Sequence, residues 1–114
     1  MSDCIFCRIG NKTVPSRQIY EDDQCLAFED INPQARVHIL VIPKRHLSSL
    51  ADVQESDVPL IGHLMMICAK IAKEREIEES GYRVVANTGA EAGQTVFHLH
   101  FHVLGGRIFG WPPG

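Results

Sequence analysis

The sequence predicts an α+β fold, in which a mainly antiparallel five-stranded sheet is combined with one long helix and short helical turns. Strand-like runs, which alternate apolar and polar residues or are rich in β-branched residues, occur in five places. Helical spacing of apolar residues extends over only one long segment. Because the strands and the helix are segregated along the chain, antiparallel pairing is favoured. The expected strands are residues 17–21, 25–29, 37–42, 82–87 and 98–104, and the expected helix is residues 58–75.

Length and composition predict the class of protein. A chain of 114 residues predicts a single domain over residues 1–114. A hydrophobic share of 45% and a charged share of 22% are typical of a soluble globular protein. The net charge of −3 gives no support for nucleic-acid or membrane-surface partners. Because the sequence lacks both an apolar run of about 20 residues and a signal-peptide pattern, we expect a cytoplasmic protein without a membrane partner.

The first motif is a Cys-x-x-Cys formed by Cys4 and Cys7. Such a pair is half of a zinc site, a redox pair, or two small and partly buried thiols. The redox interpretation requires a thioredoxin-like strand, turn and helix, which the sequence does not show. On the residues alone, the zinc and buried-thiol interpretations both stay open.

Two polar residues stand out around the next strands. The strands at 17–21 and 25–29 form a hairpin, and Asp30 follows the second strand, just before a proline turn. The Asp30 carboxylate either caps this turn or meets a ligand hydroxyl. His38 interrupts the apolar run 37–42, which is typical of a central strand. It is either a hydrogen-bonded core histidine or a partner of other site histidines.

A short helical turn at 47–50 and the long helix lead to the last two strands. The strand at 82–87 ends at Asn87, beside a glycine-punctuated loop at 89–95. Exposed backbone N–H groups in this loop and the Thr95 hydroxyl can bind an oxyanion or a phosphate. Trp111, near the end of the chain, is expected to dock against another surface, with a partner subunit as one option.

The strand at 98–104 carries the chemistry that the sequence predicts. Its run His-Leu-His-Phe-His-Val-Leu places His98, His100 and His102 on one face, because successive strand side chains point to opposite faces. Three imidazoles on one face either bind a metal or handle an anion, with one ring as nucleophile or base. The adjoining glycine loop favours the anion, since it offers donors for a phosphate.

The histidine run resembles the His-φ-His-φ-His-φ-φ signature of the histidine triad (HIT) family, where φ is an apolar residue. Five further segments are similar to the Hint branch, the histidine triad nucleotide-binding proteins, so the resemblance extends over nearly the whole chain. They are Asp-Ile-Asn-Pro at 30–33, Val-Ile-Pro-Lys at 41–44, Ala-Gly-Gln-Thr at 92–95, Leu-Gly-Gly-Arg at 104–107 and Trp-Pro-Pro-Gly at 111–114.

This resemblance implies a homodimer with a shared sheet and hydrolysis of purine nucleoside phosphoramidates, such as AMP joined to an amine. His100 would be the nucleophile that takes the nucleotidyl group, His102 would contact the phosphate, and His98 would support the strip. His38 would orient or protonate His100. The implied nucleotide-binding residues are Asp30 for the ribose, Asn87, Gly93, Gln94, Thr95 and Val96 near the phosphate, and Ile5, Phe6, Ile9, Phe28, Ile31 and Leu40 around the base.

The resemblance also bears on metals and on alternative functions. In triad proteins that carry the cysteine pair, the pair is similar to half of a structural zinc site, which His46 and His98 would complete here. No metal is required for the expected catalysis. Thr95 stands where the family often has serine and keeps the hydroxyl. The alternative functions are a regulatory nucleotide-binding protein with incidental hydrolysis, and a metalloenzyme that uses the triad as ligands, which the glycine loop and Asp30 disfavour.

Overall fold

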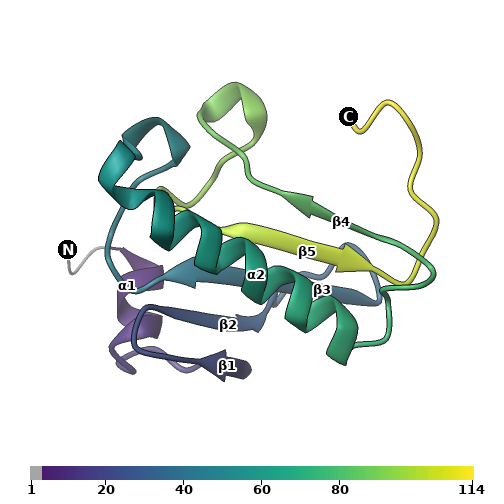
Figure 1. Cartoon of the computed structure of the whole chain (residues 1–114), viewed down its shortest axis with the longest axis horizontal. Helices are drawn as coiled ribbons and strands as arrows, with labels where there is room; N and C mark the ends of the chain where they lie inside the picture. Colours follow the sequence, from purple (N-terminus) through teal and green to yellow (C-terminus); the bar gives the residue numbers. More distant parts are fainter. Residues whose placement is uncertain (1–3) are drawn as a thin grey trace.

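A five-stranded antiparallel sheet with strand order β1–β2–β3–β5–β4 organises the molecule (Figure 1). The computed structural model describes residues 4–114, so the first three residues of the predicted domain lie outside the described residues. The α+β prediction with one long helix is confirmed. The elements are α1 (Ile5–Gly10), β1 (Gln18–Glu21), β2 (Cys25–Glu29), β3 (Val37–Pro43), α2 (Val58–Glu74), β4 (Tyr82–Val85) and β5 (Phe101–Gly105), with 3-10 turns at Leu50–Asp52, Glu55–Asp57 and Ala90–Ala92.

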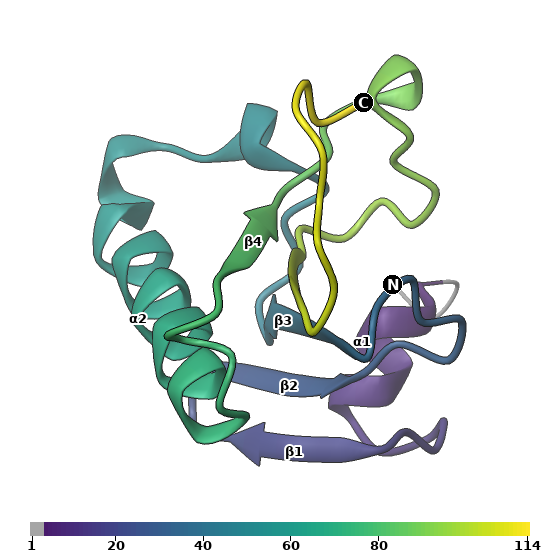
Figure 2. The ribbon, with the colours of Figure 1, turned by 90° about the vertical axis from the view of Figure 1, so that its right-hand side faces the viewer.

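The two faces of the sheet have different coverings because successive side chains alternate between them. Figure 2 shows α2 on one side of the sheet, and α1 with the C-terminal tail on the other side. In β3, Ile39 and Val41 belong to the core beneath α2, whereas Leu40 and Ile42 pack with Phe6 of α1. His38 lies on the α1 side with Leu40, and this side therefore carries the candidate site.

Helix α2 forms because its apolar residues recur at helical spacing and Pro59 occupies its first turn, where a missing N–H costs nothing. Its buried residues, which include Leu64, Ile67 and Ile71, face the sheet. Among residues 4–114, no helix combines the length and the apolarity that crossing a bilayer requires.

One prediction about local structure was wrong, and one helix was not predicted. Strand β5 begins at Phe101 and not at residue 98, because the N–H of Leu99 donates to Leu47 O, in the loop after β3, and not to a neighbouring strand. The segment around the cysteine pair was not predicted to be helical, yet it forms α1. The Cys4 sulfur accepts a hydrogen bond from the Cys7 N–H at 3.3 Å and so caps that short helix.

Smaller differences concern the ends of elements. Strand β3 extends one residue further than predicted, to Pro43, and β4 ends at Val85, two residues earlier. Helix α2 ends at Glu74, and the short turn after β3 lies at Leu50–Asp52. None of these shifts moves a candidate site residue to the other face of the sheet.

Candidate active site

The histidine strip, by which we mean His98, His100 and His102, runs along β5 and the extended segment before it, on the α1 side of the sheet. The rings of His100 and His102 are neighbours, with centroids 4.9 Å apart. Phe6 of α1 contacts the strip edge-on, 5.1 Å from the His100 ring and 6.0 Å from the His98 ring. The strip is therefore covered at one end by α1 and open toward β4.

Hydrogen bonds determine which nitrogen of each imidazole carries a proton. The backbone N–H of Gln34 donates to His38 Nδ1 at 3.0 Å, so the proton of neutral His38 is on Nε2. That Nε2–H lies 2.9 Å from Nδ1 of His102 and donates to it. His102 consequently carries its own proton on Nε2. The structure thus places His38 against His102, and any action of His38 on His100 passes through His102.

His100 has the opposite arrangement. Its Nδ1–H donates to the backbone carbonyl of His98 at 2.7 Å, which leaves the lone pair on Nε2. Nε2 has no hydrogen-bond partner among the described residues, although no solvent-inaccessible side-chain nitrogen in residues 4–114 is left without one. Nε2 of this largely buried residue is therefore reachable from solvent, as a nucleophile must be.

Burial keeps the histidines beside His100 neutral. It lowers the pKa of His102 to about 4, and the neighbouring His100 and His38 rings add to this effect. Burial also lowers the pKa of His38, against the opposing charge of Asp30. At neutral pH, His102 is then a neutral donor through Nε2–H, which suits a contact with a phosphate oxygen.

Asp30 takes the first of the two roles that the sequence left open, that of a turn cap. Its Oδ1 accepts the N–H of Asn32 at 2.8 Å and caps the turn after β2. Its Oδ2 lies 3.4 Å from His38 Nε2. The carboxylate is thus held beside the His38–His102 pair, at the edge of the open face.

Within the glycine loop, the side chain of Gln94 makes internal hydrogen bonds. Its side chain accepts the N–H of Gly89 at 2.8 Å and donates to Ser48 O at 2.7 Å, and the residue is buried. Gln94 therefore fixes the loop to the segment after β3 and does not present a free amide. Gly93 adopts a left-handed conformation with φ 89°, and Thr95 is exposed next to it.

The apolar residues expected around a base divide into two groups. Phe6, Ile9, Phe28 and Leu40 are buried together against the sheet. Ile31 is 98% exposed and Ile5 is 39% exposed. The four buried residues form a packed apolar floor on the sheet. The two exposed residues offer apolar surface that the flat ring of a base could cover.

The second cluster in this region unites all four residues that the resemblance connected with zinc. The donor atoms of Cys4, Cys7, His46 and His98 lie within 4.8 Å of one another. His98 Nδ1 lies 3.3 Å from the Cys4 sulfur, 3.6 Å from the Cys7 sulfur and 3.1 Å from His46 Nδ1. Four tetrahedral zinc ligands are separated by about 3.3 to 3.8 Å at ordinary bond lengths, so the donor set fits a zinc ion.

Sequence reasoning missed several groups that position the site. The N–H of Gln34 and the carbonyl of Pro43, which His98 Nε2 contacts at 2.8 Å, are backbone groups without a sequence signal. A cavity of about 260 Å³ beside His38, Asn87 and His102 is also lined by Arg83, Arg107 and Phe109. The arginine after the Gly-Gly pair was the only available signal for this cationic wall.

Together these groups suit the transfer of an anionic group to an imidazole. An exposed Nε2 lone pair on His100 lies beside a neutral N–H donor on His102. The Asp30 carboxylate lies beside His38, and the exposed Ile31 follows it in the β2–β3 loop. This geometry provides a nucleophile, a donor for a developing oxyanion, and recognition groups.

Comparisons with known proteins identify sequences and structures that are similar to this chain. An uncharacterized HIT-like protein of Synechocystis sp. is 51% identical over 112 residues, covering 98% of this chain and 97% of that protein. The crystal structure of a HIT family hydrolase from Legionella pneumophila has a TM-score of 0.97 at 42% identity, covering 98% of this chain and 100% of that one. A histidine triad nucleotide-binding protein from Candida albicans has a TM-score of 0.83 at 31% identity, covering 98% and 85%. With the HIT domain model matching residues 11–108, the chain belongs to the HIT domain family.

Proposed function

We propose that the protein is a phosphoramidate hydrolase of the Hint branch, which cleaves the P–N bond between a purine nucleoside monophosphate and an amine. His100 Nε2 attacks phosphorus, a nucleotidyl-histidine forms, and the amine leaves with a proton. Water then attacks the same phosphorus and regenerates the imidazole. Covalent catalysis of this kind divides one difficult displacement into two easier ones.

The observation that carries this proposal is the opposite tautomers of the two neighbouring histidines. His100 directs a lone pair into the site and His102 directs an N–H. A neutral imidazole is a competent nucleophile near pH 7, and a fixed N–H donor stabilises charge that develops on the phosphoryl oxygens. The hydrolase and nucleotide-binding names of the Legionella and Candida proteins agree with this chemistry.

Recognition of the nucleotide follows from the same face. Asp30 would hold the ribose hydroxyls, and Ile31 and Ile5 would contact the base above the floor of Phe6 and Phe28. Further contacts to the phosphate would come from Asn87, Gly93, Thr95 and Val96.

The test is release of AMP from adenosine 5′-phosphoramidate by the purified chain. We expect His100→Ala to lose about a thousandfold or more in kcat/KM, as removal of a nucleophile does. His63→Ala is the control, because this histidine lies on α2 and contacts Asp22, away from the strip. Mass spectrometry of the rapidly quenched wild type should detect the nucleotidyl adduct on His100.

Equal activity of the His100 and wild-type proteins would refute the nucleophilic role. Absence of wild-type turnover with AMP still bound would instead favour a regulatory nucleotide-binding protein. Activity that depends on an added metal in every preparation would favour the metalloenzyme.

We also propose a structural zinc site at Cys4, Cys7, His46 and His98. The His98 Nε2–H donates to Pro43 O, which leaves Nδ1 to face the other three donors, and a zinc ion here would join α1 to the sheet. Catalysis requires no metal in this proposal, because no step passes through the ion.

Elemental analysis tests the site independently of activity. We expect one zinc per chain in the wild type and in His100→Ala, and its loss in a Cys4→Ser/Cys7→Ser variant, with a lowered Tm after chelation. The assignment would be contradicted if the wild-type protein contained no metal and its Tm changed with neither added zinc nor chelator.

The third proposal is a homodimer formed through the β4 edge and α2. Within residues 4–114, strand β4 pairs only with β5, so its other edge is available for a strand from a second copy. Val58, Met65 and Met66 of α2 are 62%, 41% and 69% exposed. At 100° per residue these positions share one outer face of α2 with Gly62 and Ala69. Trp111, 84% exposed on the tail, would contact the partner near its site.

A further inference from the structure

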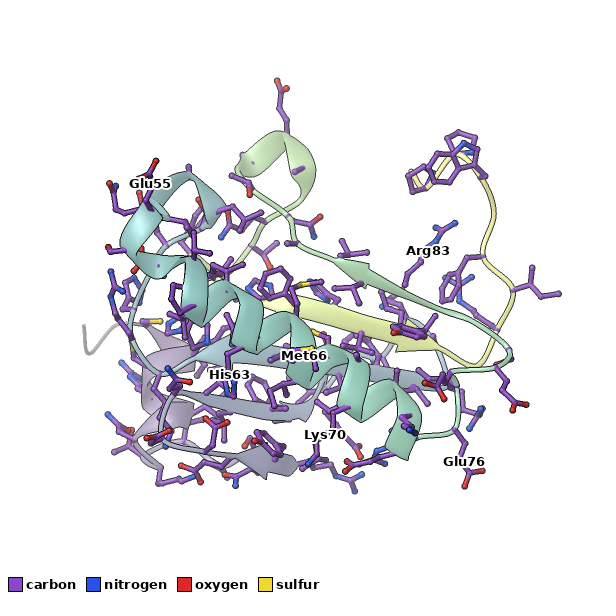
Figure 3. All side chains as sticks on the ribbon, in the orientation of Figure 1. Glu55, His63, Met66, Lys70, Glu76 and Arg83 are labelled. Carbon is purple, nitrogen blue, oxygen red and sulfur yellow. The ribbon has the colours of Figure 1, made fainter. Side chains whose placement is uncertain are left out.

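A basic cavity lies at the end of β5, next to the histidine site. Its volume is about 600 Å³, and its lining includes Arg36, Ser80, Arg83, Arg107 and Phe109. It contains no histidine, and it shares Arg83, Arg107 and Phe109 with the smaller cavity beside His38 and His102. Figure 3 labels Arg83 on β4, on the side where the C-terminal tail runs.

The register of the sheet brings these arginines together from three parts of the chain. Gly105 of β5 pairs with Val37 of β3 on one side and with Tyr82 of β4 on the other. Arg36 and Arg83 adjoin Val37 and Tyr82 in the sequence, and Arg107 lies two residues after Gly105. Gly106 turns the chain with φ 91°, and a Cβ there would lie 2.7 Å from Arg36 Cβ. Only glycine allows the Arg36 side chain to lie across this turn.

The positive charges of these arginines are not neutralised by carboxylates. Within residues 4–114, none of the three makes a salt bridge, whereas Arg17, Arg45 and Arg75 each pair with a carboxylate. This absence is selective, because the chain as a whole has a net charge of −3.

Neutral groups hold two of the guanidinium groups in place. Arg83 and Arg107 lie 5.1 Å and 4.3 Å from the centroid of the Phe109 ring. Arg83 donates to Gly110 O, and Arg107 donates to Gln34 O at 2.9 Å. A ring face and carbonyls orient a guanidinium but leave its full charge, so the cavity retains a concentrated positive potential.

We propose that this cavity is a second anion-binding site, which takes a phosphate or polyphosphate group. Guanidinium forks match phosphate oxygens in a bidentate manner. An anion with three or more terminal oxygens can engage arginines from three directions and the Ser80 hydroxyl, whereas a carboxylate has only two oxygens. The site is separate from the histidine strip and does not depend on the function proposed above.

The probe is inorganic pyrophosphate. Its binding is measured from the amide chemical shifts of the full-length chain and by calorimetry. We expect shifts at 80–83 and 106–109, in the wild type and equally in His100→Ala. Arg36→Gln should weaken binding about tenfold or more, because it removes a charged hydrogen-bonding contact. Arg36→Lys, which keeps the charge but not the fork, should bind with intermediate affinity. Arg17→Gln is the matched control, since Arg17 is exposed and remote, and it should bind like the wild type.

Two ligands distinguish the sources of such a phosphate. Equal affinity for pyrophosphate and ADP indicates that the cavity recognises the phosphates alone. Tighter binding of ADP, when adenosine by itself does not shift these amides, indicates that the cavity takes the phosphate end of a nucleotide. Both results support the anion site.

Three results would overturn it. Shifts confined to residues 98–102 would place the anion at the histidines. Acetate binding as tightly as pyrophosphate would indicate only a diffuse positive field. If pyrophosphate does not bind and Arg36→Gln instead weakens self-association, the cavity belongs to an interface between copies.

Discussion

At the scale of single residues, the lowered pKa of His102 makes folding stability depend on pH. Its pKa is about 4 in the folded protein and about 6.5 in an unfolded chain. Between these values the unfolded state binds a proton that the folded state does not. Folding stability should therefore fall as the pH is lowered from 6.5 to 4. His102→Asn, whose Oδ1 can accept the His38 proton, should flatten this part of the profile.

The measurement is Tm against pH for the two proteins. Above about pH 7 both side chains are neutral, so the Tm difference between wild type and variant should be constant there and serves as the internal control. Below pH 6.5 the two curves should converge or cross. Curves that stay parallel from pH 7 to pH 4 would mean that His102 does not carry this acid sensitivity.

The sequence predicts which side chains meet at the site but not their protonation. Alternation along 98–104 was enough to place His100 and His102 on one face, where their ring centroids lie 4.9 Å apart. The tautomers depend on Gln34 N–H and His98 C=O, and every residue except proline has both groups. Such backbone partners become visible only in three dimensions.

At the scale of elements, packing at the end of β5 makes Gly105 intolerant of a side chain. A Cβ at this position would lie 2.6 Å from Ile77 Cδ1 and 3.0 Å from Ile77 Cβ. Ile77 is fully buried after α2, so it cannot move without opening the core. Gly105→Ala should therefore lower the free energy of unfolding by about 1 to 3 kcal/mol, as overpacking does.

Gly62→Ala is the matched control within α2. Nothing lies within 4 Å of a Cβ built there, and alanine has the better helix propensity, so this variant should gain about 0.5 to 1 kcal/mol. Urea denaturation of both variants measures whether the free energy of unfolding falls in Gly105→Ala and rises in Gly62→Ala. A neutral Gly105→Ala would show that the contact between β5 and Ile77 is looser than the distances indicate.

Periodicity predicted the long elements well and the short ones poorly. The period of α2 covers seventeen residues and predicted both ends to within a residue. Helix α1 has only six residues, too few for a period, and its Cys4 cap uses a sulfur that ordinary capping rules do not weigh. The start of β5 was misplaced because alternation continues through 98–100, where the ladder of hydrogen bonds does not.

At the scale of the whole molecule, the exposed face of α2 predicts self-association. His63 and Lys70 mark the flank of this helix that faces β1, since His63 contacts Asp22 and Lys70 lies over the Tyr20 ring. At 100° per residue, the exposed apolar face is centred about 100° around the helix from this flank, on the side away from β1, and β4 is the outer strand on that side of the sheet. A single two-fold contact between two copies would pair the free edge of β4 and bury the exposed apolar face of α2.

Met66→Asp tests this contact, because it introduces a charge at the most exposed apolar position of α2, where Met66 is 69% exposed. Sedimentation equilibrium should give a dimer for the wild type and a dissociation constant raised about tenfold or more for the variant, since a buried unpaired charge costs several kcal/mol. Ile31→Asp is the control: Ile31 is 98% exposed and lies in the loop between β2 and β3, not on α2, and its variant should remain dimeric. Because Trp111 is proposed to complete the partner's site, Met66→Asp should also lower kcat/KM at low protein concentration and recover at high concentration. A monomeric wild type, or equal dissociation of both variants, would contradict the proposed dimer contact through α2. Each chain would then hold a complete site by itself.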